Sequence, residues 1–287
     1  MIPRHCLVAG AGGFLCGLLA LEGQARYDAW TLRSVESVAS TSAEFVATRE
    51  VVPFATLREG RKVMVAVVFG QSNASNVGET KRRSHARVLN FFEGQLFRAE
   101  DPLLGGDDVR GSVWTRLGDL LIEGKHFDEV VFIPIAVSGS AITRWQPGGD
   151  IHPVLMKRLE DARTNGLTIT HLLWHQGETD AERHTAKKHY QQSFNAMLSS
   201  IRREGVMAPI YVSVATRCGR QRPDPIVQGA QIELVDPKQG VYAGPNTDTL
   251  GFEYRFDGCH FADAGLDAAA QLWLQALTRQ PQIPLKS

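Results

Sequence analysis

The chain has 287 residues, of which 43% are hydrophobic and 22% charged, a balance that supports one large folded domain with a sizeable core. Lysine and arginine together number 31, as do aspartate and glutamate, so the formal net charge is zero. A protein that attracts a polyanion through its overall field carries an excess of basic residues. The composition therefore argues against a nucleic-acid partner and favours a small or neutral ligand.

The first 25 residues differ in character from the rest of the chain. Arg4 and His5 precede an uncharged run from Cys6 to Leu21, long enough for the core of a signal peptide but short of the ~20 residues that span a membrane. Small residues in Gly23-Gln24-Ala25 follow, as a signal peptidase requires. We predict cleavage after this tripeptide and export to the periplasm or the medium. The alternatives are an uncleaved membrane anchor and a buried N-terminal helix of a cytosolic protein.

Two of the four cysteines, Cys6 and Cys16, would leave with the signal peptide. The remaining pair, Cys218 and Cys259, both follow strand-like segments and could pair in an oxidising compartment. A disulfide and two buried free thiols are both open at this point. The chain has no CxxC motif and no Cys/His ligand spacing, so we expect no structural zinc site, and we expect no metal or cofactor.

The informative pattern of the chain begins at Arg61. Residues 26–60 show little periodicity, and we interpret them as an N-terminal extension that packs on the main domain or links to it. The apolar run Val63–Phe69 then ends at Gly70, which is typical of a strand buried on both faces of a parallel sheet. Similar runs follow at residues 130–137, 169–174 and 210–215.

Between and after these runs, apolar residues recur at helical spacing over residues 113–123, 151–162, 186–203 and 263–277. Strands that alternate with helices predict right-handed crossovers and a parallel sheet covered on both faces. Segment 88–97 predicts an additional strand or hairpin. We therefore predict one domain over residues 61–280, an α/β fold in the form of a three-layer α/β/α sandwich of the flavodoxin-like type, with about five parallel strands.

Ligands of such sheets bind beyond the carboxyl ends of the strands, and the residues there are unusual. Three of the predicted strands are followed by Gly70–Asn73, Ser138–Ser140 and His175–Asp180, and a fourth polar segment, Asp257–Phe261, lies near the C-terminus. The GQSN, WHQGETD and DGCHF sequences in these segments resemble the blocks of the SGNH hydrolase superfamily. More narrowly, they resemble its sialate O-acetylesterase and acetylxylan esterase branch, carbohydrate esterase family six. The resemblance covers roughly residues 63–275.

This resemblance implies a serine esterase with a catalytic triad. Ser72 would be the nucleophile, because a strand-to-helix turn with a glycine can expose its weakly nucleophilic hydroxyl. His260 would be the general base, and Asp257 would orient the imidazole and stabilise its charged form. Read alone, Ser72 could simply cap a helix, and His260 could be a structural or solvated histidine.

The resemblance also implies three donors to the oxyanion of the tetrahedral intermediate. They would be the amide of Ser72, the amide of Gly139 and the side-chain amide of Gln176, which stands where much of the superfamily has Asn. Loss of one such donor typically costs ~3 kcal/mol of barrier. For Gly139 the alternative is a simple turn glycine.

Further residues are predicted to support the site or bind the substrate, namely Gln71, Asn73, Glu178 and Trp145. We expect Glu178 to bond the loop that holds Ser72, or the substrate. Glu178 and Asp180 do not suit a glycosidase, whose two carboxyl groups stand ~5 to 9.5 Å apart across a sugar ring.

The remaining polar and aromatic residues near these segments have simpler readings. Thr179 and Asp180 are expected to cap a helix. Trp145 could face a sugar or lie in the core, while a core position is expected for Trp174. The adjacent acids at 107–108 are expected to be solvated.

Taken together, these assignments predict removal of O-acetyl groups from a carbohydrate, either a polysaccharide or an acetylated sugar, through an acyl-enzyme on Ser72. An O-acetyltransferase with the same triad is one alternative, since the acyl-enzyme does not dictate its acceptor. An inactive carbohydrate-binding protein of the same fold is another. The sequence does not predict the oligomeric state.

Overall fold

The computed structural model describes residues 42–57, 60–219 and 222–279. The predicted signal segment, residues 1–25, lies outside the described residues, as does the following part of the N-terminal extension up to residue 41. None of the helices in the described ranges is long and apolar enough to cross a membrane.

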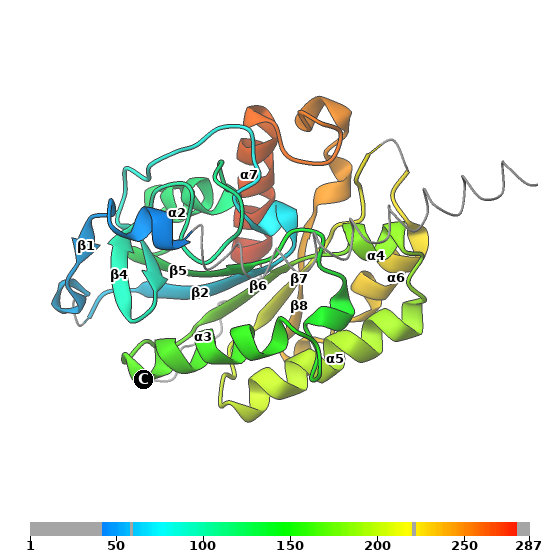
Figure 1. The fold of residues 1–287 in the computed structure, drawn as a ribbon, viewed down its shortest axis with the longest axis horizontal. Coiled ribbons are helices and arrows are strands. Elements are labelled where there is room, and N and C mark those ends of the chain that lie inside the picture. Colours follow the sequence, from blue (N-terminus) through cyan, green and yellow to red (C-terminus); the bar gives the residue numbers. More distant parts are fainter. Residues whose placement is uncertain (1–41, 58–59, 220–221, 280–287) are drawn as a thin grey trace, which may run out of the picture.

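Within the described ranges, one sheet of eight strands forms the centre of the molecule (Figure 1), with the order β1-β4-β3-β5-β2-β6-β7-β8. The strands are β1 (Val51–Val52), β2 (Val63–Gly70), β3 (Val88–Phe92), β4 (Gln95–Arg98), β5 (Glu129–Ala136), β6 (His171–His175), β7 (Ile210–Val214) and β8 (Val241–Asn246). From β3 to β8 the neighbouring strands are parallel. Strand β4 is antiparallel to both β3 and β1.

The predicted fold class is confirmed, but the sheet is larger than expected. Strands β5, β2, β6, β7 and β8 follow the flavodoxin-like order 2-1-3-4-5. The predicted number of about five strands is too low, because the β3–β4 hairpin and β1 extend the sheet beyond β5. That hairpin confirms the prediction for segment 88–97. Strand β8 was not predicted, since Gly244 and Pro245 interrupt its sequence pattern, which only an edge strand tolerates.

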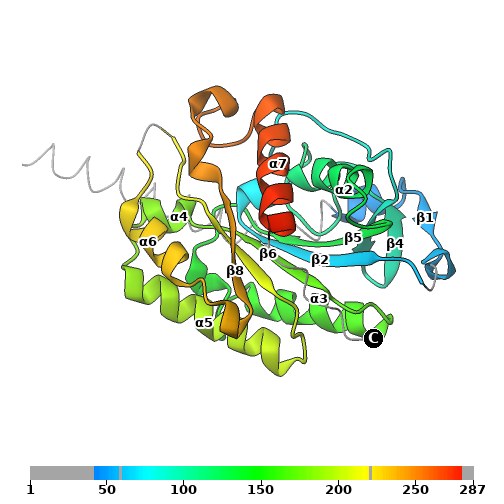
Figure 2. The same cartoon turned by 180° about the vertical axis from the view of Figure 1, so that it is seen from behind.

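Helices cover both faces of the sheet (Figures 1 and 2). Helices α2 (Val113–Glu123) and α7 (Asp263–Arg279) lie on one face, and α3 (His152–Thr164), α5 (Lys187–Arg203) and α6 (Pro225–Glu233) lie on the other. The short helix α4 (Glu178–Glu182) follows β6. The four predicted helices are present with ends shifted by at most two residues, whereas α6 was not predicted. Its start is fixed by Asp224, whose carboxylate accepts from two backbone N–H groups of the first turn.

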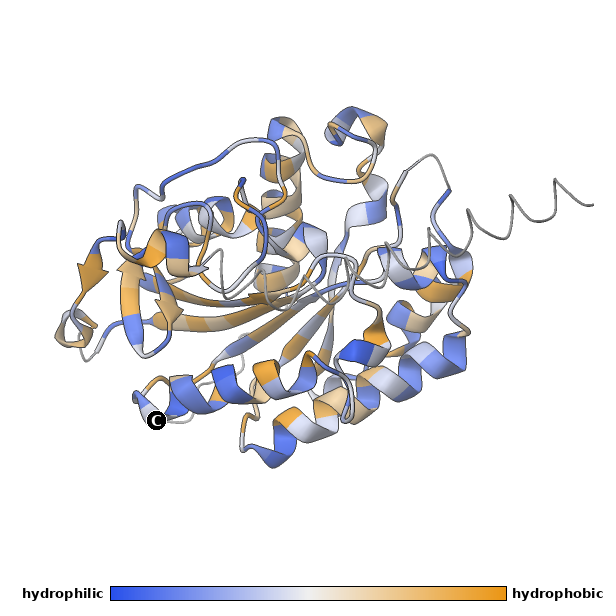
Figure 3. Cartoon of the chain, viewed as in Figure 1, coloured by the Kyte–Doolittle hydropathy of each residue, from blue (hydrophilic) through white to orange (hydrophobic). Residues whose placement is uncertain are grey.

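The continuous apolar run in β2 reflects burial on both sides. Val65 and Phe69 pack in the cluster shared with α3 and α5, whereas Met64 and Val68 pack in the cluster shared with α2 and α7. Side chains alternate between the faces of a strand, so a strand covered on both faces must be apolar at every position. The apolar strands and the polar outer faces of the helices are visible in Figure 3.

Strand β2 ends where it comes closest to the end of β6. Gly70 has a φ of 139°, and a Cβ at this position would lie 2.0 Å from the carbonyl oxygen of His175. The Gln71 N–H donates to that same oxygen at 3.1 Å. Only glycine permits this approach. Strands β2 and β6 are neighbours whose connections lead to opposite sides of the sheet, so their carboxyl ends form the switch point at which such folds bind ligands.

The described part of the N-terminal extension packs on the main domain. Strand β1 pairs with β4, with Val51 opposite Phe97 and Val52 opposite Leu96. Nearby, the hydroxyl of Ser42 accepts a hydrogen bond from the Gly105 N–H at 3.0 Å. Residues 42–57 therefore extend the sheet on the side away from β8.

Candidate active site

Ser72 lies in the turn that follows β2. It begins a single turn of 3-10 helix, Ser72–Ala74, and 4% of its surface is exposed. The turn is closed by hydrogen bonds from the Ala74 and Ser75 N–H groups to the carbonyls of Gln71 and Ser72, both at 2.8 Å. The backbone that carries the Ser72 hydroxyl is thereby fixed at the switch point of the sheet.

His260 and Asp257 form a hydrogen-bonded pair within one loop. Nδ1 of His260 lies 2.6 Å from Oδ2 of Asp257, and the other carboxylate oxygen accepts from the His260 N–H at 2.7 Å and the Cys259 N–H at 2.9 Å. Partial burial opposes ionisation of Asp257, but these hydrogen bonds lower its pKa below the usual value. A carboxylate at Nδ1 selects the tautomer that leaves Nε2 as a proton acceptor.

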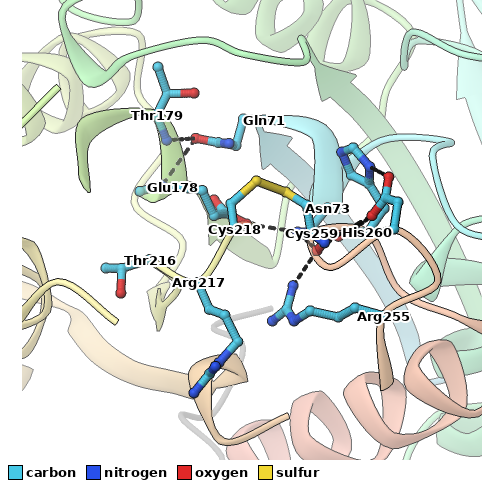
Figure 4. The surroundings of a disulfide bond; sticks show 12 residues. Gln71, Asn73, Glu178, Thr179, Thr216, Arg217, Cys218, Arg255, Cys259 and His260 are labelled. Atoms are coloured by element: carbon cyan, nitrogen blue, oxygen red, sulfur yellow. Dashed lines mark hydrogen bonds and ion pairs between the residues drawn. A yellow bond between two sulfur atoms is a disulfide. The ribbon is translucent and has the colours of Figure 1, made fainter. Parts of the chain in front are cut away.

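Two hydrogen bonds bring the segment Ser72–Glu79 and the His260 loop side by side. Asn73 donates from Nδ2 to the carbonyl of Cys259 at 3.3 Å. The Glu79 N–H donates to the carbonyl of Phe261 at 3.0 Å. Because Cys259 and Phe261 are the two neighbours of His260, both sides of the imidazole-bearing residue are attached to the segment that begins with Ser72. Figure 4 shows the contact on the Cys259 side.

Glu178, the first residue of helix α4, supports the same turn. Its Oε1 accepts from Nδ2 of Asn73 at 2.8 Å, which agrees with the expectation that Glu178 bonds the loop holding Ser72. Burial raises the pKa of Glu178 to about 7, against the smaller opposing effects of the Asn73 bond and the nearby Arg255 guanidinium. Glu178 begins helix α4, so neither Thr179 nor Asp180 is its N-terminal cap, and that prediction is wrong.

The structure corrects the role predicted for Gln176. Its side chain is fully buried, and Nε2 donates to Gln71 Oε1 at 3.2 Å, to the Ser140 carbonyl at 3.0 Å and to Asp180 Oδ2 at 2.5 Å. Its Oε1 accepts from the Tyr190 hydroxyl at 3.0 Å. With every hydrogen of this amide engaged inside the protein, Gln176 links the loops after β2, β5 and β6 and does not donate to an oxyanion.

Gln71 has a supporting role of the same kind. Its Oε1 also accepts from the Gly177 N–H at 3.3 Å and the Thr179 N–H at 3.2 Å, and only 3% of the residue is exposed. Gln71 therefore fastens the nucleophile turn to the start of α4 (Figure 4).

The loop after β5 is held by a residue that the sequence reasoning misjudged. Asp107 was expected to be solvated, yet it is 5% exposed and its carboxylate accepts from the Ser138 N–H at 2.7 Å and the Ser138 hydroxyl at 2.8 Å. Burial raises the pKa of Asp107. Gly139 follows with a φ of 67°, a conformation that favours glycine. Asp107 thus fixes the loop that presents the Gly139 amide.

The main-chain amides of Ser72 and Gly139 are available to an external acceptor. Within the described ranges, no protein oxygen accepts a hydrogen bond from either N–H group. The two amides follow the carboxyl ends of β2 and β5, which are adjacent strands with Gly70 opposite Ala136. This arrangement suits an oxyanion that forms between the two loops.

Trp145 lies in the core, which is one of the two positions that the sequence left open for it. It is fully buried, its ring lies 6.0 Å from that of Phe69 and 5.2 Å from that of Trp174, and Nε1 donates to the Ser140 hydroxyl at 3.0 Å. The core position expected for Trp174 is confirmed. Trp145 belongs to the core cluster on the α3 and α5 side of the sheet, where it packs on the central strands β2 and β6.

Exposed aromatic rings near the site come from the His260 loop, whereas Trp145 is buried. Of the large hydrophobic side chains that are exposed in the described ranges, the aromatic ones are Phe252, 48% exposed, and Phe256, 38% exposed. The ring of Phe256 lies 6.2 Å from the imidazole of His260, and the Arg110 guanidinium lies 5.2 Å from the Phe256 ring. Sequence reasoning missed these residues, although Phe256 is adjacent to the DGCHF segment.

Two further features fix the His260 loop. Cys218 and Cys259 form a disulfide, which decides between the two alternatives that the sequence left open. Arg255, 5% exposed, donates to the carbonyls of Cys259, of Thr247 at 3.0 Å and of Leu250 at 3.2 Å. No group of three or more His, Cys, Asp or Glu side chains in the described part of the chain is arranged to hold a metal ion.

A flavodoxin-like sheet with a serine turn after its first strand and an Asp-His loop near the C-terminus defines an SGNH-type hydrolase. Residues 62–277 match the family described as carbohydrate esterase, sialic acid-specific acetylesterase. The chain belongs to this family, whose members are carboxylic ester hydrolases acting on carbohydrate.

Similar proteins agree with this assignment at the level of the fold. Over 73 residues the chain is 32% identical to the Probable carbohydrate esterase At4g34215 of Arabidopsis thaliana, a match spanning 25% of this chain and 28% of that protein. The X-ray structure of AT4G34215 superposes with a TM-score of 0.61 at 21% identity, covering 76% of this chain and 97% of the other. The crystal structure of NanS gives a TM-score of 0.55 at 15% identity, covering 76% and 97%.

Replacement of Glu178 by Gln tests whether burial raises the pKa of the Glu178 carboxyl in the folded chain. Between about pH 4.5 and pH 7 the folded chain keeps a proton that the unfolded chain releases, so this group makes wild-type stability fall as pH rises. Gln cannot ionise, so the free energy of unfolding of Glu178→Gln, relative to wild type, should increase from pH 5 to pH 8 in urea unfolding.

The control is Glu182→Gln, on the exposed side of the same helix, which should show the same difference from wild type at both pH values. A Glu178→Gln difference that does not change with pH would contradict the raised pKa of Glu178.

Proposed function

We propose that this chain is a serine esterase that removes acetyl groups from O-acetylated carbohydrate through an acyl-enzyme on Ser72. The observation that carries the proposal is the attachment of the segment Ser72–Glu79 to both neighbours of His260, which also pairs with Asp257. Nucleophile, base and orienting carboxylate thus come from segments held side by side at the ligand-binding edge of the sheet.

In the first step, Nε2 of His260 takes the proton of the Ser72 hydroxyl as its oxygen attacks the ester carbonyl carbon. The carbonyl oxygen becomes an oxyanion, and the free amides of Ser72 and Gly139 donate to it. The C–O bond to the sugar then breaks, and the imidazolium returns its proton to the sugar oxygen. Asp257 stays ionised throughout and stabilises the imidazolium.

In the second step, water attacks the acetyl-serine with His260 as base, and acetate leaves as the Ser72 oxygen regains its proton. The same chemistry with a sugar hydroxyl in place of water would make the chain an acetyltransferase. The site reaches solvent on the His260 side, where 27% of the imidazole side chain is exposed, so water has access to the acyl-enzyme.

A carbohydrate leaving group is supported by the exposed aromatic surface beside His260. Aromatic faces pack against the apolar C–H surface of sugar rings. Phe256, 6.2 Å from the imidazole, is positioned to contact a sugar whose acetyl ester reaches Ser72. In this proposal Phe256 takes the sugar-contacting role that was one of the two alternatives for Trp145.

Substitution of the nucleophile gives the direct test of the reaction. Ser72→Ala should lower kcat for p-nitrophenyl acetate by a factor of about 10⁴ or more, because loss of a triad nucleophile removes the acyl-enzyme route. Its thermal unfolding should stay close to wild type, as should the activity of the exposed-serine control Ser199→Ala. Turnover by folded Ser72→Ala at the wild-type rate would remove Ser72 from its role.

Substitution of Phe256 tests the sugar-facing surface. Phe256→Ala should lower kcat/KM for an acetylated xylo-oligosaccharide about tenfold, the effect of losing one aromatic contact, and should lower that for p-nitrophenyl acetate less, because this ester has no sugar ring. The control is Met207→Ala, an exposed side chain before the amino end of β7. Equal losses on both esters would mean that Phe256 acts on His260 and not on the sugar.

A further inference from the structure

The Cys218–Cys259 disulfide lies directly beside the proposed general base. Cys259 precedes His260 in the chain, and Cys218 lies four residues after the end of β7. The bond therefore joins the loop after β7 to the loop that carries Asp257 and His260, across a sequence separation of 41 residues (Figure 4).

Every polar group of Cys259 is engaged. Its N–H donates to Asp257, its carbonyl accepts from Asn73 and from the Arg255 guanidinium, and its sulfur is bonded to Cys218. Figure 4 shows Asn73 and Arg255 at this residue together with the disulfide. Cys259 is thus the point at which the serine turn, the histidine loop and the β7 loop meet.

Some of the contacts around Cys259 fix the shape of the His260 loop, and others fix its position relative to other segments. The bonds made by Arg255 reach Thr247, Leu250 and Cys259, and those accepted by Asp257 come from Cys259 and His260. All of these groups lie within residues 247–260, so the bonds set the internal shape of the loop. They tie the loop to Thr247, which follows β8 and donates from its hydroxyl to the Val214 carbonyl at 3.2 Å, but none of them reaches the Ser72 turn directly.

Two contacts tie Cys259 to segments outside its own loop. One is the hydrogen bond from Asn73, which at 3.3 Å is long for an N–H···O bond, and the other is the disulfide. The far end of the disulfide is anchored by β7, which ends four residues before Cys218, and by the Ala215 N–H, which donates to Oε1 of Gln231 at 3.1 Å. The covalent link therefore transmits a fixed position from the end of β7 to the residue before His260.

We infer that the Cys218–Cys259 disulfide positions His260 against Ser72, so that reduction of this bond lowers turnover while the fold and substrate binding persist. The inference rests on the proposed function. Phe261 is buried in the core and its carbonyl remains bonded to Glu79, so the reduced loop stays attached on its other side. The effect is a displacement of the base and not an unfolding of the site.

The disulfide is open to a reductant on one side, since Cys218 is exposed while Cys259 is buried. A dithiol attacks as its thiolate at the Cys218 sulfur, the S–S bond breaks, and Cys259 leaves as a thiolate. The second thiol of the reductant then displaces Cys218 and closes a cyclic disulfide. Two electrons and two protons pass to the protein, which gains two thiols.

The experiment uses the full chain with Cys6→Ser and Cys16→Ser, so that Cys218 and Cys259 are its only cysteines. Dithiothreitol should release two thiols per chain and lower kcat for p-nitrophenyl acetate about tenfold, with KM changed little, because a misplacement near 1 Å can cost as much as ~10²-fold. The circular dichroism spectrum should persist, and reoxidation should restore kcat.

The matched control adds Cys218→Ser and Cys259→Ser to the same background. It should be folded, have the low kcat of the reduced chain and be insensitive to dithiothreitol. A double variant with the oxidised chain's kcat would overturn the inference, as would release of two thiols without change in kcat or a parallel loss of the folded spectrum. Absence of hydrolysis by the oxidised chain would instead overturn the proposed function, and the inference with it.

Discussion

The side-chain amide of Asn73 donates to Glu178 on one side and to the Cys259 carbonyl on the other, at 2.8 and 3.3 Å. Asn73 follows Ser72 and Cys259 precedes His260, so one amide connects two segments that lie 186 residues apart. A triad catalyses only when its members are held in reach before the substrate arrives. The chemistry proposed for this site depends on that connection and on the groups that keep the amide in place.

Those groups form a buried polar network beneath the serine turn. Gln71, Gln176, Glu178 and Asp180 are all buried, and their hydrogen bonds link the loops after β2, β5 and β6 to one another. Buried polar groups are costly when unpaired and rigid when paired. Because its polar groups are buried and paired, the network holds the turn after β2, the Ser138–Ser140 loop and the start of α4 in fixed positions relative to one another. Oxyanion donors require this preorganisation.

The sequence predicted the features that local pattern determines. Two-sided burial made β2 a continuous apolar run, and the glycine at 70 marked its end, so strand and turn were found together. The link of Glu178 to the serine loop also agreed. Gln176 was assigned wrongly and Trp145 was left with two alternatives, because a side chain's direction depends on partners that lie far away in the chain, such as Tyr190 for Gln176 and Phe69 for Trp145. Asp107 looked solvated because its partner, Ser138, lies 31 residues away, and the disulfide likewise required the fold.

The most direct test of the central claim is the rate at which a fluorophosphonate labels the wild-type chain and His260→Ala, with the modified residue identified by mass spectrometry. If the two residues act as one unit, the probe attaches to Ser72 in the wild type, and labelling of the folded variant is slower by a factor of about 10³ or more. Attachment at another residue, or equal rates in the two chains, would contradict the account.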